Sequence, residues 1–352
     1  MLLEEKLEWG PLATFVPNKH LPVYNWFYFK EGFSRDLIFK LKDLLNLKPP
    51  LLDPFCGSGT SLLACRELGW DAWGFDIMPI CILASRAKTA EYQPERLKLY
   101  YKQLFSESFK PVRKQFPGWI KRFFLSPTLQ DIAFFLPRIE GIAEAKYRDF
   151  FKLALITSAV KCSWIWRDGM LKVKKHPVPP FRKFFQRRLK RMIKEWERFP
   201  KKPCQIWIEL GDARKLSLPD SCINTVITSP PYLNQVDYPS LYRVENWFCS
   251  PALPGLRSCI GLADPQAYFS DLESTLAELY RVCKPKAKLA IIIGNAWVSG
   301  ELIESDLRLA ELAKEQGFRV KKILVLNKRY ALERRTIKRG ILRESAVLLT
   351  KP

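Results

Sequence analysis

Residues 47–79 read LKPPLLDPFCGSGTSLLACRELGWDAWGFDIMP, and the order of elements in this segment indicates the fold class. A short apolar segment leads into a glycine-containing turn at 53–60, and the apolar spacing over 62–68 is that of a helix. Gly69 is placed to end the helix, and 72–75 reads as a second strand. Strand, turn, helix and strand in this order form a βαβ unit, so we expect a parallel sheet.

The same alternation returns in the last third of the chain. Two strands, a helix, a strand, a helix and a closing antiparallel strand pair are predicted, in that order, at 205–213, 222–232, 269–285, 287–296, 304–318, 319–330 and 343–351. We therefore predict an α/β protein with a Rossmann-like, doubly wound sheet. A long segment at 88–204, which looks mostly helical, interrupts the sheet and divides the chain into 1–87, 88–204 and 205–352.

Composition limits the class of protein. The 352 residues are 47% hydrophobic and 27% charged, which is typical of a globular chain. The nine cysteines show no C-x-x-C spacing and only two histidines are present, so we expect no zinc or other metal site. The cysteine pattern, the lack of a signal-peptide pattern and the lack of a long apolar run indicate a cytoplasmic protein without a membrane span. The low counts of Asn and Gln hint at a thermophilic source.

The charge predicts a polyanionic partner. Formal net charge is +22, and half of this excess lies in 171–202, where thirteen Lys or Arg accompany two acids. Aromatic residues are interleaved with these basic side chains, a pattern that favours nucleic-acid contact, although an ordinary solvated helix face remains an alternative. The candidate contacts are Lys174, Lys175, Arg182, Lys183, Arg187, Arg188 and Arg191.

Three acids follow predicted strands and indicate a nucleoside cofactor. Asp53 opens the turn that contains Gly57 and Gly59, Asp76 closes the next strand, and Asp212 ends the strand after it. The turn lacks both the G-x-G-x-x-G spacing of a pyrophosphate site and the Lys of a triphosphate loop. An acid after the second strand is placed to bind ribose hydroxyls. Three acids suit a nucleoside with a cationic, amine-bearing tail, which describes S-adenosylmethionine.

A second motif, TSPPY, ends the strand predicted near 228. Two prolines have no N–H for a sheet, so Pro230 and Pro231 must stop the strand and form a rigid tip. The hydroxyl of Ser229 and the carbonyl of Pro230 are two natural acceptors for the hydrogens of a base amine. Such hydrogen bonds free the nitrogen lone pair, while the ring of Tyr232 can stack on a base that has left its duplex.

The pair DPFCGSGT and TSPPY resembles the motifs of the amino-methyltransferases, which methylate exocyclic amines of nucleic-acid bases. The resemblance covers 18–87 and 205–350 and implies a methyltransferase sheet, S-adenosylmethionine as cofactor and TSPPY as the catalytic motif. It implies cofactor contacts from Trp26, Phe27, Asp53, Phe55, Gly57, Gly59, Thr60, Asp76 and Asp212. The insertion between the second and third strands lies where the family has no usual target-recognition region.

The serine of the second motif favours one base. Family members with serine at this place mostly act on N4 of cytosine, and those with aspartate mostly on N6 of adenine. DNA is the first choice of polymer and structured RNA, including ribosomal RNA, the alternative, because the motifs do not distinguish them. A loop over the base at 234–238 and a basic loop at 327–345 are further candidate contacts. A capped helix start at the first and a solvated hairpin at the second are the alternatives. A protein-amide methyltransferase and a binding module with a decayed site fit the charge and the intact motifs less well.

Overall fold

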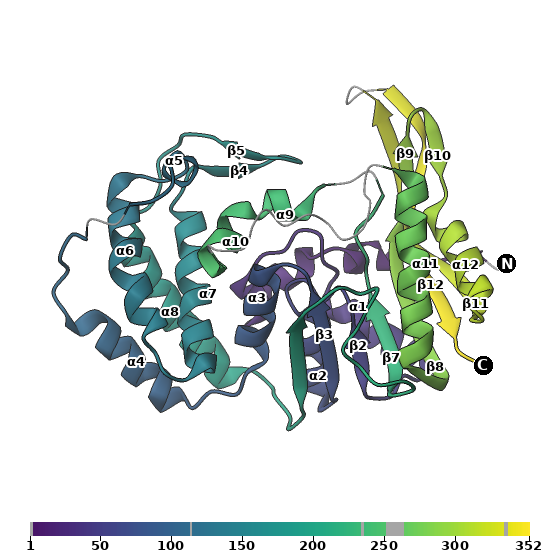
Figure 1. The fold of residues 1–352 in the computed structure, drawn as a ribbon, viewed down its shortest axis with the longest axis horizontal. Coiled ribbons are helices and arrows are strands. Elements are labelled where there is room, and N and C mark those ends of the chain that lie inside the picture. The colour runs from purple at the N-terminus through teal and green to yellow at the C-terminus, as the bar shows by residue number, and fades with distance from the viewer. Residues whose placement is uncertain (1–2, 113–114, 234–235, 251–263, 334–336) are drawn as a thin grey trace.

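A computed structural model describes residues 3–112, 115–233, 236–250, 264–333 and 337–352. Its centre is an eight-stranded sheet with strand order β1-β11-β12-β8-β7-β2-β3-β6 (Figure 1). The strands from β8 to β6 run parallel, whereas β12 is antiparallel to both β8 and β11. The doubly wound sheet and its antiparallel closing pair, both predicted from the sequence, are confirmed.

The first half of the sheet begins as the sequence predicts. Its elements are β2 (Leu51–Asp53), α2 (Thr60–Leu68), β3 (Ala72–Asp76), α3 (Pro79–Thr89) and β6 (Ile206–Leu210). All three residues of β2 are buried, as expected of a central parallel strand covered on both faces. Gly69 takes a left-handed conformation, with φ of 74°, at the end of α2.

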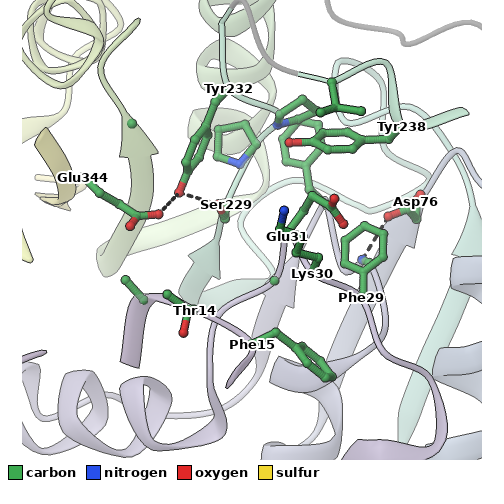
Figure 2. A pocket seen from close by; sticks show the side chains of 18 of the residues that line it. Thr14, Phe15, Phe29, Lys30, Glu31, Asp76, Ser229, Tyr232, Tyr238 and Glu344 are labelled. Atoms are coloured by element: carbon green, nitrogen blue, oxygen red, sulfur yellow. Dashed lines mark hydrogen bonds between the residues drawn. The ribbon is translucent and has the colours of Figure 1, made fainter. Parts of the chain in front are cut away.

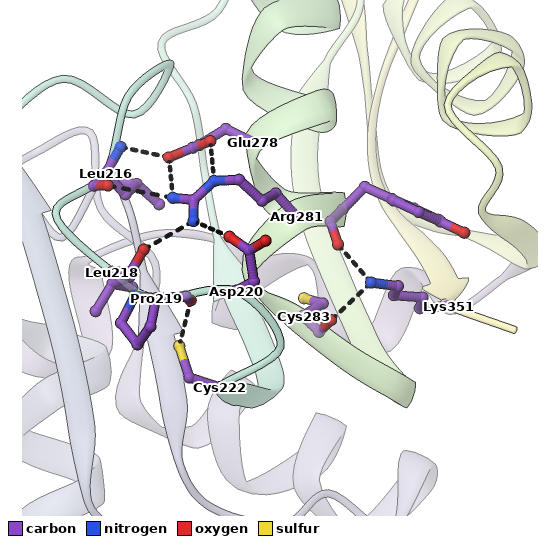
Figure 3. A network of polar contacts seen from close by, with 10 residues as sticks. Leu216, Leu218, Pro219, Asp220, Cys222, Glu278, Arg281, Cys283 and Lys351 are labelled. Atoms are coloured by element: carbon purple, nitrogen blue, oxygen red, sulfur yellow. Dashed lines mark hydrogen bonds and ion pairs between the residues drawn. The ribbon is translucent and has the colours of Figure 1, made fainter.

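The second half supplies the remaining strands. Its main elements are β7 (Ile223–Thr228), α11 (Pro265–Val282), β8 (Cys283–Gly294), α12 (Ser305–Glu315), β11 (Arg319–Glu333) and β12 (Ile337–Thr350). Arg281, near the end of α11, donates to Leu218 O at 2.8 Å and pairs with Glu278, which anchors the β6–β7 connection to this helix (Figure 3). Because β7 pairs with both β2 and β8, the strand order reverses beside β2, where a crevice forms at the carboxyl ends of the strands.

The predicted insertion is mostly helical and packs on the other side of α3 from the sheet centre (Figure 1). It contains α4 (Pro94–Ser106), α5 (Gly118–Lys121), α6 (Ser126–Glu140), α7 (Ala145–Lys161) and α8 (Phe181–Arg198), with a hairpin of β4 (Ile165–Arg167) and β5 (Leu171–Val173). Its apolar side chains form one cluster with Phe15, Trp26 and Phe27 from the N-terminal segment. The insertion therefore shares its core with residues that precede the first strand of the βαβ unit.

Several further elements complete the fold. They are β1 (Leu3–Glu5), the 3-10 helices η1 (Leu7–Ala13), η2 (Val16–His20) and η3 (Tyr24–Trp26), α1 (Arg35–Leu45), α9 (Tyr238–Leu241), α10 (Arg243–Cys249), β9 (Ala296–Val298) and β10 (Glu301–Ile303). β1 pairs with β11, and the 3-10 helices carry the chain along the carboxyl edge toward α1. No helix in the described part of the chain is long and apolar enough to cross a membrane.

Candidate functional site

A cavity of about 400 Å³ lies at the carboxyl ends of the central strands, a size that suits a nucleoside ligand. The segments that line it come from the N-terminal region, the glycine turn, the end of β3, the TSPPY motif and the paired strands β11 and β12 (Figure 2). Both predicted motifs therefore face one cavity. Of the predicted site residues, it is lined by Phe55, Gly57, Asp76, Ser229, Pro230, Pro231 and Tyr232.

The glycine turn is held open by its backbone conformation. Gly57 has φ of 51°, a left-handed value that glycine adopts without strain. A Cβ at this position would lie 3.0 Å from the ring of Phe29, so the aromatic ring packs directly on the turn. Below it, the buried ammonium of Lys88 donates to Ser58 O at 2.9 Å, and burial lowers the pKa of this lysine to about 7. The turn is thus fixed from both sides.

Asp76 is the carboxylate that faces the cavity. It accepts hydrogen bonds from the backbone N–H groups of Gly57 and Met78, both at 2.9 Å. Burial raises its pKa to about 6, although these two hydrogen bonds act in the opposite direction. Its position after the second strand of the βαβ unit is the one at which an acid can accept from ribose hydroxyls.

Asp53 has a different setting from Asp76. Its side chain is 2% exposed and does not line the cavity. The carboxylate accepts hydrogen bonds from the hydroxyls of Ser61 and Thr228 and from the N–H of Phe55. Burial raises the pKa of Asp53 to about 6. Asp53 therefore joins the glycine turn to the end of β7 rather than facing a ligand.

The other predicted cofactor contacts, Gly59, Thr60 and Asp212, lie next to the cavity but do not line it. Gly59 and Thr60 begin α2, and Gly59 approaches Ser85 so closely that a Cβ would lie 2.6 Å from its hydroxyl oxygen. Asp212 follows β6, and its carboxylate pairs with Arg214 at 2.7 Å. The neighbours of Asp212 on both sides line the cavity, but its own side chain does not.

Neither of the two predicted aromatic contacts lines the cavity. Trp26 is fully buried, and its indole N–H donates to Glu195 Oε2 at 2.8 Å. Phe27 is also buried, with its ring against that of Phe29 at 6.3 Å. Phe29 is the aromatic residue of this segment that lines the cavity. An irregular segment has no fixed side-chain period, which is why the sequence could not show which ring turns inward.

Two charged residues that follow Phe29 line the cavity and were missed. They are Lys30 and Glu31. Glu31 accepts a hydrogen bond from Tyr242 Oη at 2.8 Å, and burial raises its pKa. The letters FKEG after an aromatic run were the only local signal for these residues.

The TSPPY motif forms a partly buried chain of hydrogen bonds that ends on strand β12. Ser229 Oγ donates to Tyr232 Oη at 3.2 Å, and Tyr232 Oη donates to Glu344 Oε1 at 2.9 Å (Figure 2). The ring of Tyr232 lies against Gly294, where a Cβ would be 2.7 Å from Tyr232 Cδ2. Tyr268 Oη donates to the carbonyl of Pro231 at 2.9 Å, which secures the rigid tip. Glu344 had not been identified from the sequence.

The two predicted loops are partly described. In the loop over the base, Asn234 and Gln235 lie outside the described residues, whereas Val236 and Tyr238 line the cavity. Asp237 stands at the N-cap of α9, but its carboxylate accepts from the Ser240 hydroxyl and not from a backbone N–H of the helix. In the basic loop, residues 334–336 lie outside the described ranges, and Arg329 of β11 lines the cavity.

The predicted basic contacts divide into buried and exposed groups. Arg188 is buried, and its guanidinium donates to Trp26 O at 2.6 Å, so it is removed from the predicted surface. Arg182 pairs with Asp131 at 2.6 Å, and Arg191 lies 3.6 Å from Glu195. The exposed residues of the set are Lys174, Lys175, Lys183, Arg187 and Arg191. Within the described ranges, no group of three or more His, Cys, Asp or Glu side chains could hold a metal ion.

The strand order and the two motifs on one cavity define an S-adenosylmethionine-dependent methyltransferase. The chain is 25% identical to the type II methyltransferase M.BsoBI of Geobacillus stearothermophilus, over 90% of this chain and 83% of that protein. It is 25% identical to the type II methyltransferase M.AvaI of a Nostoc species, over 93% of this chain and 85% of that protein. No family model matches the sequence.

A solved structure of a putative DNA modification methylase from Thermus thermophilus, in complex with S-adenosylmethionine, is 22% identical. The match covers 40% of this chain and 54% of that chain, with a TM-score of 0.28.

Proposed function

We propose that the protein transfers a methyl group from S-adenosylmethionine to N4 of cytosine in DNA. The observation that carries this proposal is the position of Ser229 on the same cavity as Asp76. One residue offers an acceptor to a base amine, and the other offers a carboxylate to a nucleoside cofactor. The relatives named type II methyltransferases support DNA as the polymer.

The residues of the cavity fit the cofactor. Asp76 would accept from the ribose hydroxyls, and the open conformation of Gly57 leaves room for the ligand beside the turn. Phe29 and Phe55 offer apolar surface on the same side. Glu31 supplies an anionic group for a cationic tail. When bound, S-adenosylmethionine supplies an electrophilic methyl group on its sulfonium.

The protein acts on the target amine by holding it. The Ser229 hydroxyl oxygen and the Pro230 carbonyl would accept from the two amine hydrogens, which draws the nitrogen toward tetrahedral geometry and exposes its lone pair. The two prolines and the Tyr268 hydrogen bond fix this tip before the base arrives, so little reorganisation is needed. Tyr232 would hold the base that has left the duplex.

The nucleic-acid surface that we propose includes the β4–β5 hairpin. Trp166 and Met170 are 45% and 63% exposed, and Lys174 lies 4.2 Å from the centre of the Trp166 ring. Exposed aromatic rings beside lysines are the usual means of holding unstacked bases and phosphates. Exposed Lys175 and Lys183 continue the positive surface onto the start of α8.

Contacts of one arginine connect the hairpin to the wall of the cavity. Arg167 of β4 donates to Leu241 O at 3.1 Å, and its guanidinium lies 4.9 Å from the centre of the Tyr242 ring. Tyr242 in turn donates to Glu31 at the cavity wall. In Figure 1 the hairpin lies above α9 and α10, on the side of the sheet toward which β7 points. A duplex on this hairpin could therefore deliver a base to the cavity.

The decisive experiment is a transfer assay with labelled cofactor. Unmodified plasmid DNA and total RNA are offered separately, and the products are digested to nucleosides and separated by mass spectrometry. The proposal expects N4-methylcytidine in its deoxy form. N6-methyladenine as sole product would overturn the choice of base, and label in RNA alone would overturn the choice of polymer. Ser229→Ala should lose turnover while keeping its affinity for the cofactor.

A further inference from the structure

The hydrogen bonds that begin at Ser229 all donate in the same direction, away from the serine. Ser229 donates to Tyr232, Tyr232 donates to Glu344, and Glu344 lies on β12 directly opposite Gly294 of β8. Tyr232 and Glu344 are 112 residues apart in the sequence, so this chain of hydrogen bonds exists only in the folded sheet. Tyr232 and Glu344 both line the cavity that holds Ser229.

We propose that Glu344 is a positioning residue that makes Ser229 an acceptor. This inference rests on the proposed methylation of an exocyclic amine at this site. A serine hydroxyl can donate or accept, whereas an ionised carboxylate can only accept. With Glu344 at the end, the Tyr232 proton points to the carboxylate and the Ser229 proton points to Tyr232. The lone pairs of Ser229 are then left for the target amine.

Neighbouring groups favour the ionised, accepting form of Glu344. On the adjacent strand β11, Asn327 pairs in register with Glu344, and its side chain and the positive charge of Arg329 both act to lower the pKa of the Glu344 carboxyl. Tyr232 donates from the cavity side, and the charge of Glu344 also acts on Tyr238, which lines the same cavity. Burial opposes these groups and raises the pKa of Glu344.

The same chain provides a route for the proton that the reaction releases. When the N4–methyl bond forms and the methyl–sulfur bond breaks, the sulfur keeps the electron pair and the nitrogen carries an extra proton. Ser229 can take this proton while passing its own to Tyr232, and Tyr232 can pass its proton to Glu344. Each transfer follows a hydrogen bond that already points in that direction.

Glu344→Gln tests the inference with almost no change in shape. The glutamine is neutral and can accept with only one of its two terminal atoms, so Tyr232 loses its charged acceptor. We expect kcat to fall about tenfold or more, because one preorganised contact to the reacting group is lost. The Kd values for S-adenosylmethionine and for DNA should stay within about twofold, a difference of about 0.4 kcal/mol.

The pH profile gives a readout that a merely structural role would not move. Protonation of Glu344 removes the acceptor, so kcat of the parent should decline as pH falls through the raised pKa of this group, and this decline should be absent in Glu344→Gln. A second readout is the phenol carbon resonance of Tyr232 in protein labelled at tyrosine. It should shift in Glu344→Gln without any substrate present, since its hydrogen bond to a carboxylate is lost.

Glu278→Gln is the matched control. Glu278 is partly buried and pairs with Arg281 at 2.7 Å, but it lies in the network of Figure 3 and not on the cavity. It should leave kcat, the pH profile and the Tyr232 resonance unchanged. Equal kcat in Glu344→Gln and the parent would overturn the inference, as would a fall in kcat with an unchanged pH profile. If the parent methylates no nucleic acid, the proposed function fails first, while the resonance still reports on the hydrogen bond.

Discussion

Thr228 Oγ1 donates to Asp53 Oδ1 at 2.7 Å, across 175 residues of sequence. Asp53 opens the glycine turn, and Thr228 is the residue directly before Ser229. This buried hydrogen bond fixes the cofactor side of the cavity relative to the catalytic side. The distance over which a methyl group must travel is therefore set partly by one side-chain contact between β2 and β7.

Thr228→Val removes this contact with little change in volume. A buried carboxylate that loses a donor should reduce the free energy of unfolding by about 1–3 kcal/mol. The pKa of Asp53 is about 6 in the folded protein, above its usual value, so burial of its charge costs stability as pH rises through 6. The loss caused by Thr228→Val should accordingly be larger at pH 7 than at pH 5 in denaturant titrations.

Thr157→Val serves as the control for this variant. The Thr157 hydroxyl is also buried, but it donates to Leu153 O within its own helix α7. Its stability change should not depend on pH between 5 and 7. A similar pH dependence in both variants would contradict the assigned role of the Thr228–Asp53 hydrogen bond.

Cofactor affinity should depend on pH through Asp76. Its pKa is about 6, and only the ionised carboxylate accepts from both ribose hydroxyls. Binding of S-adenosylmethionine, measured by calorimetry from pH 5 to pH 8, should therefore weaken as pH falls below 6. Asp76→Asn should bind weakly throughout with a flatter profile.

Asp220→Asn is the comparison for that titration, since Asp220 is 75% exposed and pairs with Arg281 away from the cavity (Figure 3). Its binding curve should follow the parent at every pH. An Asp76→Asn profile as steep as that of the parent would assign the titration to another group, with Asp53 the first to test.

Gly294→Ala should reduce turnover by moving Tyr232. The added methyl carbon would lie 2.7 Å from the tyrosine ring, which is too close for a carbon–carbon contact. The ring must shift, and its hydrogen bonds to Ser229 and Glu344 shift with it. Steady-state kinetics should show a lower kcat, whereas Gly118→Ala, where a Cβ meets nothing within 4 Å, should keep the parent value. Normal kcat in Gly294→Ala would mean that the position of Tyr232 is not important.

Trp166→Ala tests the proposed nucleic-acid surface. Loss of one stacking ring costs about 1–3 kcal/mol per base, so DNA affinity by fluorescence anisotropy should fall roughly 5- to 150-fold. Lys174→Ala should weaken binding more modestly and lower the slope of log K against log salt by about 1. Leu99→Ala removes a 51% exposed apolar side chain from α4 and should bind like the parent. Unchanged binding in Trp166→Ala would exclude the hairpin as a contact surface.

The sequence predicted those parts of the site that are encoded locally. The turn at 53–60 and the TSPPY motif each lie within a few residues, so strand ends, helix start and exposed tip follow from short-range rules. Arg188 could also have been placed, because it falls at helical spacing with Phe181, Phe185 and Met192, all buried on one face of α8. The prediction for 171–202 used only the number of charges and not this periodicity, and it therefore placed Arg188 on the surface.

Other parts of the site depend on contacts between distant segments. Glu344 faces Tyr232 only because β12 pairs with β8 in the register that sets Glu344 opposite Gly294. A shift of one residue would turn this carboxylate to the other face of the sheet. No local pattern around RESAVLLTK encodes that register. The choice of Phe29 over Trp26 and Phe27 likewise depends on the packing of the insertion.

The hydrogen bonds between α8 and the N-terminal segment limit how this enzyme can be re-engineered. Glu195 accepts from Trp26, Asn25 and Val23, and Arg188 binds the Trp26 carbonyl, only three residues before the aromatic wall of the cavity. A chimera that exchanges 88–204 alone would leave three donors and a carbonyl without partners. A replacement of 88–204 that is intended to change the target preference must therefore include residues 18–34 as well. Both segments must be taken from the same parent protein.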